Sequence, residues 1–214
     1  MIHDVHLFAE LSPDDSQLLT ERCVVRSFPK NTILMNEGDE TDSLYVITSG
    51  KVKVFVSDEN GKEIILNILG PGEYFGELAL LDDSPRSASV MTLEDSRFSV
   101  ISRSDFQQCL VDYPDIAMSL IRALAQRIRS LTDNVRSLAL MDVYGRVART
   151  LLDLAADKDG KLEIEQRLTH QDIANMVGAS REMVSRIFKD LTIGHYISVD
   201  KGRITINEKL PRHW

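Results

Sequence analysis

Hydrophobic and polar residues alternate through much of the first half of the chain, and this pattern predicts β-strands. The clearest stretch is SLYVITSGKVKVFVSDENGKEIILNILGPGEYFGE, within residues 28–101. Turn signals at 49–50, 59–61 and 70–72 separate the alternating runs. Many short strands at this spacing favour an antiparallel sandwich or roll. We therefore predict a β-roll in the N-terminal part of the chain.

Residues 115–141 follow a helical pattern and contain neither glycine nor proline. About 27 residues at roughly 1.5 Å each make a rod of about 40 Å. Its hydrophobic residues are spaced alternately by four and three positions, which is the seam of a two-stranded coiled coil. The alternative is a helix packed on its own domain. Because so regular a seam would leave an apolar edge exposed in a monomer, we predict a parallel homodimer with this seam: Ala117, Ile121, Leu124, Ile128, Leu131, Val135 and Leu138.

The last part of the chain, from residue 143, contains LTHQDIANMVGASREMVSRIFKDL. Thr169 can cap one helix, Gly178 allows a left-handed turn, and Ser180 can cap the next helix. This order predicts a helix-turn-helix. In the second helix Met183 or Val184 begins the apolar stripe, which continues with Ile187, Phe188 and Leu191.

The opposite face of that second helix carries side chains that can read DNA bases: Arg181, Glu182, Ser185 and Arg186. Downstream, HYISVDKGRITI predicts a hairpin whose tip, with Lys201 and Arg203, could reach phosphate. For any one of these charges the alternative is an ordinary solvated helix face. The whole arrangement favours binding to double-stranded DNA.

Charge supports this division of the chain. The net charge is −8, but residues 1–142 hold 13 basic against 23 acidic residues, whereas residues 143–214 hold 12 against 10. The second part, at net +2, is therefore the plausible place for a polyanion.

Other features exclude several classes of protein. Cys23 and Cys109 form no CxxC, so we expect them to pack as small hydrophobes rather than to form a disulfide or bind a metal. The five histidines form no ligand pair, and we expect them at the surface or in loops. No nucleophile elbow or phosphate-transfer loop is present, so we predict no catalytic residues, no metal, no cofactor and no enzyme activity. Without a signal segment or a long apolar run, we expect a cytoplasmic protein with no membrane partner.

The stretch FGELALLDDSPRSASV, residues 75–90, predicts a nucleotide site. ELALL can form one helical turn whose N–H groups point back toward Gly76. Arg86 adds a fork matched to phosphate oxygens and Ser87 a hydroxyl donor. A ribose hydroxyl is the natural donor to the carboxylate of Glu77. The alternative is a half-buried salt bridge between Glu77 and Arg86 that supports a turn.

These motifs together resemble the cyclic AMP receptor protein (CRP/FNR) family of bacterial transcription regulators. The resemblance covers essentially the whole chain: the cassette FGELALLDDSPRSAS, the join LMDVYGRVARTLLDLA and the recognition helix GASREMVSRIFKDL. It implies an α+β fold with a jelly-roll-like cyclic-nucleotide-binding domain (1–114), a dimerisation helix and hinge (115–142), and a winged helix-turn-helix domain (143–214).

The resemblance also implies roles for the cassette residues. Glu77 would hold the ribose 2′-hydroxyl, and the cyclic phosphate would be bound by Arg86, Ser87 and the backbone of Gly76 and Leu78. Thr132, with Leu131 beside it, would contact the base. The family's cAMP-responsive pattern has a Thr-Ser pair where this chain has Leu131-Thr132, so cGMP and cyclic di-GMP remain alternatives to cAMP.

The resemblance further implies an allosteric mechanism in which the nucleotide reorients the recognition helices through a hinge near residues 142–145. The dimer would then engage a palindromic operator, with Arg186 and Glu182 reading bases while Arg181, Thr169 and the wing address phosphate. RNA polymerase is a possible partner in such a mechanism. Two alternatives remain open: a regulator that binds DNA independently of nucleotide, and a cyclic-nucleotide module of an enzyme or channel.

Overall fold

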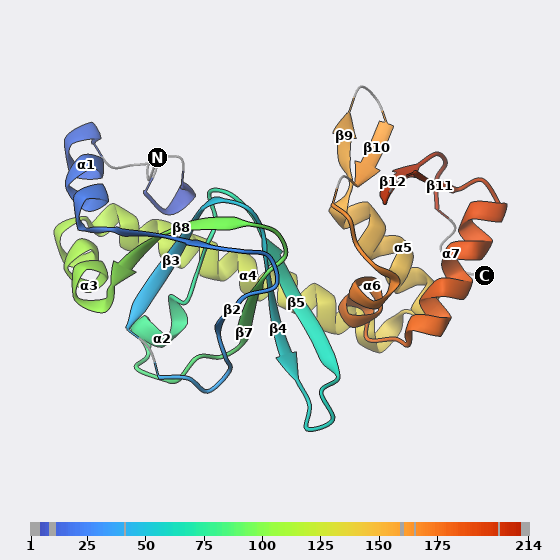
Figure 1. The fold of residues 1–214 in the computed structure, drawn as a ribbon, viewed down its shortest axis with the longest axis horizontal. Helices are drawn as coiled ribbons and strands as arrows, with labels where there is room; N and C mark the ends of the chain where they lie inside the picture. The colour runs from blue at the N-terminus through green and yellow to red at the C-terminus, as the bar shows by residue number, and fades with distance from the viewer. Residues whose placement is uncertain are drawn as a thin grey trace. The chain divides into compact units, whose positions relative to one another are not determined.

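The computed structural model describes residues 5–8, 12–40, 42–158, 161–164, 166–200 and 202–210. The chain divides into two compact units, Met1–Arg129 and Ser130–Trp214. Figure 1 shows strands gathered in the first unit, with helices and shorter strands in the second.

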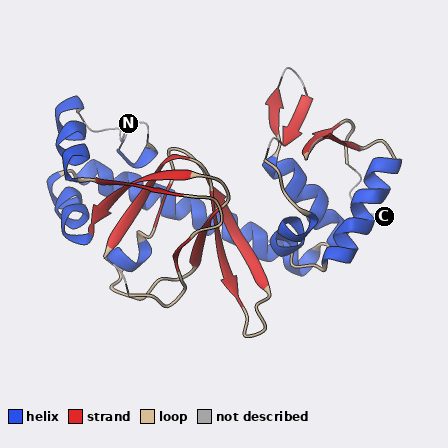
Figure 2. Ribbon diagram, viewed as in Figure 1, coloured by secondary structure: helices blue, strands red, loops and turns tan. Residues whose placement is uncertain are grey.

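The first unit is built around two four-stranded sheets, whose strands are drawn in red in Figure 2. One sheet has the order β1 (Val24–Phe28), β8 (Ser96–Ser102), β3 (Ser43–Ser49), β6 (Tyr74–Phe75). The other has the order β2 (Ile33–Met35), β7 (Ser89–Thr92), β4 (Val52–Ser57), β5 (Glu63–Leu69). These strands pair antiparallel, which confirms the predicted roll.

Glycine makes the turns of the roll possible. Gly50, Gly61 and Gly72 lie in the three predicted turns with φ of 85°, 75° and 85°, a region that other residues rarely adopt. The strands then bury a shared hydrophobic cluster, in which the Phe75 and Phe98 rings meet edge to face at 5.7 Å. Such aromatic pairs add to the stability gained from burial.

Helices cover this roll. They are a 3₁₀ turn at His6–Phe8, α1 (Pro13–Arg22), α2 (Leu78–Leu81), α3 (Arg103–Asp112) and the start of α4 (Pro114–Leu140). Ser12 and Ser102 cap α1 and α3 by accepting hydrogen bonds from backbone N–H groups. Ile116 and Leu120 of α4 pack in the same cluster as Phe106 of α3. The pattern of the sequence predicts α4 but neither α1 nor α3.

Both cysteines pack on this second cluster of the roll, as predicted. Cys109 is buried and Cys23 is half-buried. Burial raises the pKa of each thiol to about 11, so both are protonated near neutral pH.

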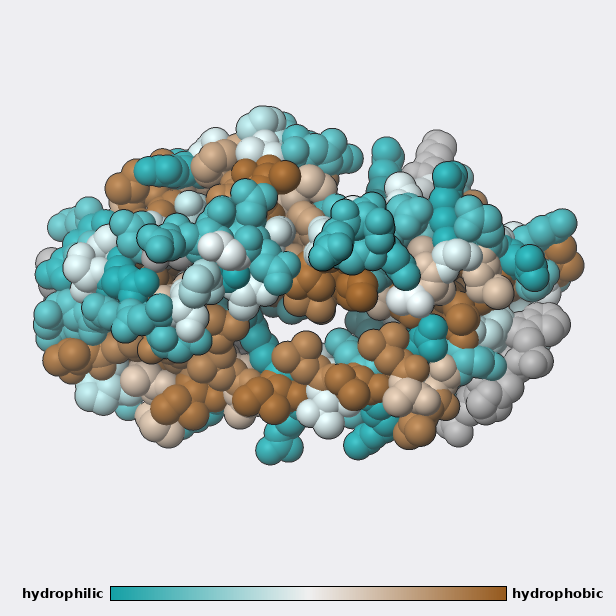
Figure 3. All heavy atoms as spheres, turned by 90° about the horizontal axis from the view of Figure 1, so that it is seen from below, coloured by the Kyte–Doolittle hydropathy of each residue, from teal (hydrophilic) through white to brown (hydrophobic). Residues whose placement is uncertain are grey.

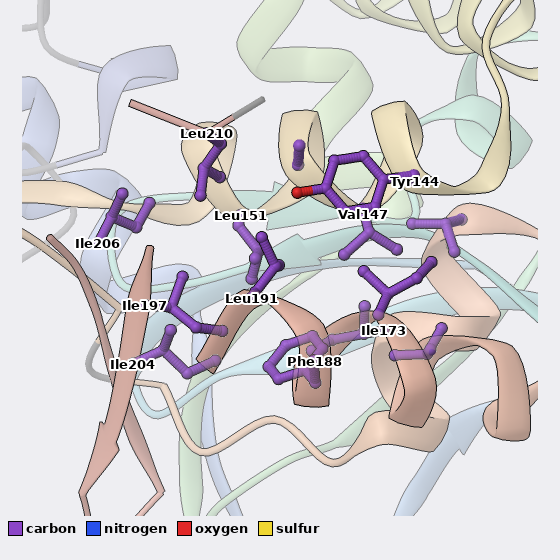
Figure 4. Packing of buried hydrophobic residues seen from close by; sticks show 14 of the residues in the cluster. Tyr144, Val147, Leu151, Ile173, Phe188, Leu191, Ile197, Ile204, Ile206 and Leu210 are labelled. Carbon is purple, nitrogen blue, oxygen red and sulfur yellow. The ribbon is translucent and has the colours of Figure 1, made fainter. Parts of the chain in front are cut away.

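The second unit contains the predicted helix-turn-helix and hairpin. Its elements after α4 are α5 (Val143–Leu154), β9 (Ala156–Lys158), β10 (Lys161–Ile164), α6 (His170–Val177), α7 (Arg181–Ile193), β11 (Ile197–Asp200) and β12 (Arg203–Ile206). The sheet order is β11-β12-β10-β9, so β9 and β10 extend the predicted hairpin. Figure 4 shows the helices and strands packing one shared core, in which Leu151, Ile173 and Leu191 are fully buried.

Two arginines of α5 bind groups of α4, of the link that follows it and of α6 within the second unit. Arg149 Nη1 donates to Ser137 Oγ at 2.6 Å. Arg146 donates to the carbonyl oxygens of Met141 and Val177 at 2.9 and 2.8 Å. Asp142 caps α5, its carboxylate accepting from the Gly145 N–H at 2.7 Å. A movement at the expected hinge, residues 142–145, would therefore break several hydrogen bonds.

Candidate nucleotide site and nucleic-acid interface

Arg86 is held by backbone groups from two parts of the roll. Its side chain is buried, and Nη1 and Nη2 each donate to a carbonyl oxygen at 2.7 Å, those of Gly76 and Ser43. Burial lowers the pKa of its guanidinium, while nearby acids including Glu77 partly compensate. Gly76 has a φ of 88°, and a Cβ on it would overlap Arg86 Nη1. Glycine is therefore needed here for the cassette to close on the arginine.

Glu77 is paired with Arg127, a residue of α4. The Glu77 side chain is only 2% exposed, and its carboxylate accepts from Arg127 Nη1. Arg127 Nη2 donates to the Tyr74 carbonyl oxygen at 3.0 Å, and the guanidinium lies 5.4 Å from the centre of the Tyr74 ring. Burial raises the pKa of Glu77, and Arg127 opposes the shift. The cassette is thus tied to the long helix within the first unit.

The remaining cassette residues lie nearer the surface. Leu78 begins α2 and is 41% exposed, and Ser87 is exposed beside buried Arg86. Arg103, the first residue of α3, donates to the Ala79 carbonyl oxygen at 3.0 Å and pairs with Asp83. This arginine therefore anchors the C-terminal end of α2.

Neither Arg127 nor Arg103 was predicted from the sequence. Arg127 contacts a residue 50 positions earlier and Arg103 one 24 positions earlier. No rule of local spacing links positions so far apart. The buried acid at Glu77 was a usable signal, because a buried carboxylate generally has a cationic partner.

The long helix exposes most of its predicted seam in a single chain. Ile121, Ile128, Leu131, Val135 and Leu138 are between 50% and 65% exposed. Ala117 and Leu124 are half-buried, and Leu124 packs on the roll. In the space-filling view, hydrophobic residues lie in a row along the lower part of the molecule (Figure 3). Leu131 and Thr132 belong to the second unit, so their approach to the cassette stays a prediction.

The helix-turn-helix forms as its caps predict. Thr169 caps α6 in a capping box with Asp172, and Ser180 caps α7 by accepting from the Met183 N–H. Gly178 ends α6 in the left-handed conformation, with φ of 62°. Both cap hydroxyls therefore stabilise helix ends, whatever else they contact.

The predicted reading face of α7 is solvent-accessible in part. Arg181, Glu182 and Arg186 are exposed, and Val184 rather than Met183 begins the buried stripe. Ser185 is half-buried and its hydroxyl lies 2.9 Å from His170 Nδ1.

In the wing, Arg203 is exposed and lies 3.8 Å from a carboxylate oxygen of Glu163, whereas Lys201 falls outside the described residues. β12 therefore displays a basic side chain at the surface of the second unit, near the Glu163 carboxylate. Whether these basic residues meet phosphate stays a prediction.

His170 corrects an expectation from the sequence. It is neither at an open surface nor in a loop, but half-buried as the first residue of α6. Its ring packs on Phe188, with 4.8 Å between ring centres. Within the described residues, no cluster of three or more His, Cys, Asp or Glu side chains could hold a metal ion. Among all the residues that the structure describes, no helix is long and apolar enough to cross a membrane.

Comparison with known proteins identifies both units. The model of the cyclic nucleotide-binding domain matches residues 25–113, and that of the Crp-like helix-turn-helix domain matches residues 145–209. A CRP-like cAMP-activated global transcriptional regulator of Mycobacterium tuberculosis is 34% identical over 206 residues, covering 94% of this chain and 92% of that protein. The chain belongs to the CRP/FNR family of transcription regulators.

Other members of the family agree in sequence and in fold. The cAMP-activated global transcriptional regulator CRP of Pasteurella multocida is 37% identical, over 86% of this chain and 90% of that protein. The structure of the c-di-GMP responsive global regulator CLP of Xanthomonas campestris has a TM-score of 0.80 at 25% identity, covering 92% and 100%. The catabolite activator protein of Thermus thermophilus has a TM-score of 0.58 at 31% identity, covering 95% and 94%. The predicted family, the fold class, and the presence of nucleotide-binding and DNA-binding domains are confirmed.

Proposed function

We propose that this protein is a homodimeric transcription regulator whose binding to a palindromic operator is controlled by cAMP. The observation that carries the proposal is the cassette, in which a buried arginine fork, an exposed serine hydroxyl and a buried carboxylate occur together at Arg86, Ser87 and Glu77. A cyclic phosphodiester matches the arginine and the serine, and a ribose 2′-hydroxyl matches the carboxylate. The names of two relatives, which describe cAMP-activated regulators, favour adenine as the base.

The Glu77–Arg127 pair provides a route from nucleotide to helix. A ribose hydroxyl that donates to Glu77 adds a bond to the carboxylate that Arg127 already binds, and Arg127 belongs to α4. The nucleotide therefore stabilises one position of that helix over others. An affinity difference of about 100-fold between two arrangements supplies roughly 2.7 kcal/mol, enough to make a minor arrangement the major one.

Calorimetric titration with cAMP tests the proposal. We expect saturable binding by the wild-type protein and about tenfold weaker binding by Arg86→Lys, because lysine keeps the charge but not the planar fork. Arg97→Lys, at an exposed position of β8, is the matched control and should bind as the wild type does. If the wild-type protein binds no cyclic nucleotide, the cassette serves structure only and the regulator acts without nucleotide.

Cyclic di-GMP is the second candidate effector. The Xanthomonas regulator, which resembles this chain in fold at 25% identity, is described as c-di-GMP responsive. Leu131 and Thr132 also depart from the cAMP-responsive pattern. Titrations with cGMP and cyclic di-GMP therefore run beside the titration with cAMP. If either guanine nucleotide binds more tightly than cAMP, that nucleotide replaces cAMP as the proposed signal.

The exposed seam of α4 carries the dimer proposal. Replacing Val135 by lysine would place a charge at the centre of a coiled-coil contact, and we expect the dimer dissociation constant to rise at least about 100-fold. Gln126→Lys changes an exposed position off the seam and should leave the dimer intact. Sedimentation equilibrium measures both, and a wild-type protein that stays monomeric at micromolar concentration would refute the proposal.

The proposal divides the chain into a nucleotide-binding part (1–114), a dimerisation helix and hinge (115–142) and a DNA-binding part (143–214). Two α7 helices about 34 Å apart would enter successive major grooves, with Arg186 and Glu182 at base edges. Arg181, Arg203 and Lys201 would address phosphates. No residue of the chain is assigned a catalytic role.

A further inference from the structure

We propose that His170 sets the hydrogen-bonding character of Ser185, so that the protonation state of one histidine changes which base α7 prefers. The inference rests on the proposed function, specifically on α7 reading base edges. It assigns a role to a residue that the sequence offered only as a surface or loop histidine. The pair joins the first helix of the helix-turn-helix to the second.

The position of the imidazole is fixed by a core residue. Phe188 is buried in the hydrophobic cluster of the second unit, where Figure 4 shows it among Ile173, Leu191 and other core side chains. The His170 ring packs on Phe188 at 4.8 Å and 47°, which places Nδ1 2.9 Å from Ser185 Oγ. Because Phe188 cannot move without disturbing the core, the imidazole stays beside Ser185.

Ser185 lies within the reading face of α7. Arg181, Glu182 and Lys189 are its neighbours at i−4, i−3 and i+4 on the helix, and all three are exposed. Arg186, the next residue along α7, is exposed as well. On α6, Asp172 accepts from Thr169 in the capping box.

The serine hydroxyl has one proton and two lone pairs, so His170 decides what it can offer to DNA. When Nδ1 carries no proton, Ser185 donates its proton to the imidazole and presents only lone pairs. A lone pair suits the amino group of cytosine or adenine. When the imidazole is doubly protonated, Nδ1–H donates to Ser185, and the hydroxyl proton can donate to guanine O6 or N7 or to thymine O4.

Protonation has a second effect that must be separated from the first. A proton added to the imidazole also adds a positive charge. The added charge strengthens binding to every DNA sequence, because it acts on phosphates. A change in overall DNA affinity with pH is therefore no evidence for an effect of the His170–Ser185 hydrogen bond, whereas a change in base preference is.

The test is selection from a pool of random DNA duplexes by the full-length protein with cAMP, at about pH 6 and about pH 8. For the wild type we expect the same overall site at both pH values, with the preference at one base pair of each half-site shifting about fivefold toward guanine or thymine contacts at low pH. Ser185→Ala and His170→Gln should select a site without that shift. His195→Gln, which alters an exposed histidine outside the pair, should retain it.

Three results would overturn the inference. They are identical wild-type preferences at the two pH values, a shift that survives in Ser185→Ala, and a shift that survives in His170→Gln. Thermal unfolding followed by circular dichroism checks that the variants fold at both pH values, and His170→Asn provides a second substitution. A pool with no enriched sequence would overturn the proposed DNA-reading function as well, so the two failures are distinguishable.

Discussion

Replacing Gly76 by alanine is expected to destabilise the roll by about 4 kcal/mol and to weaken cAMP binding by more than about 100-fold. An alanine with positive φ costs about 1–2 kcal/mol on its own. At φ of 88° the new Cβ would also overlap Arg86 Nη1 and lie 3.1 Å from the Ser43 carbonyl oxygen. Arg86 would have to leave two hydrogen bonds, each worth about 1.5–3 kcal/mol because the donor is charged. Urea unfolding measures the stability and calorimetry the binding.

Gly61→Ala is the matched control for this substitution. Gly61 has a φ of 75°, and a Cβ there would have no heavy atom within 4 Å. The stability lost in Gly61→Ala therefore measures only the penalty of a positive φ, about 1–2 kcal/mol. Binding of cAMP should be unchanged. Equal losses of stability in the two variants would show that the approach of Gly76 to Arg86 contributes nothing.

The parts of the fold that follow local rules were predictable from the sequence. A serine or threonine cap, a left-handed glycine and an apolar stripe each act within one helical turn, so Thr169, Gly178 and Ser180 together predicted α6 and α7 correctly. The β-turn glycines predicted the roll in the same way. The short helices α1 and α3 were missed, although Ser12 and Ser102 cap them by the same rule, because ten residues give little periodicity.

The contacts that define the site depend on the folded chain. Arg127 reaches Glu77, Arg103 reaches Ala79, and His170 reaches Ser185 across separations of 50, 24 and 15 residues. Glu77 and Arg86 were predicted from the sequence as cassette residues, with a salt bridge between them as the alternative. In the structure the carboxylate binds Arg127 and the Arg86 fork binds two carbonyl groups. Which cation meets which acid is decided by sheet register and helix packing, which local patterns do not encode.

Arg127 connects the cassette of the proposed effector site to the proposed dimer helix. It binds the cassette through both the Glu77 carboxylate and the Tyr74 carbonyl. The same helix continues into the exposed seam at Ile128 and Leu131. The contact is therefore expected to matter for both stability and the response to nucleotide.

Arg127→Leu should destabilise the protein by about 3 kcal/mol at pH 8 and by clearly less at pH 5. Breaking a buried ion pair costs about 3–5 kcal/mol, and the lower end applies because the Arg127 side chain is 35% exposed. Burial raises the pKa of Glu77, so the folded state binds the proton more tightly than the unfolded state. The stability that this proton binding contributes is fully present below the ordinary pKa of a glutamate. It is lost as the pH rises through the raised pKa of Glu77. Arg127 lowers the pKa of Glu77, so without it more stability is lost between pH 5 and pH 8. Urea unfolding at the two pH values measures this loss.

Two further variants test whether the pH-dependent loss comes from the buried carboxylate of Glu77. Glu77→Gln/Arg127→Leu has no carboxylate at position 77, so its loss of stability relative to Glu77→Gln should be the same at pH 5 and pH 8, and part of the stability that Arg127→Leu loses at pH 8 should return. Arg129→Leu alters an exposed arginine of the same helix and should change stability by no more than about 0.5 kcal/mol. Equal losses at the two pH values, or no recovery in the double variant, would mean that Arg127 acts by packing on Tyr74 rather than by neutralising the buried carboxylate. The cassette would then have no electrostatic connection to α4 through Glu77, and a nucleotide would have to reach the dimer helix by another contact.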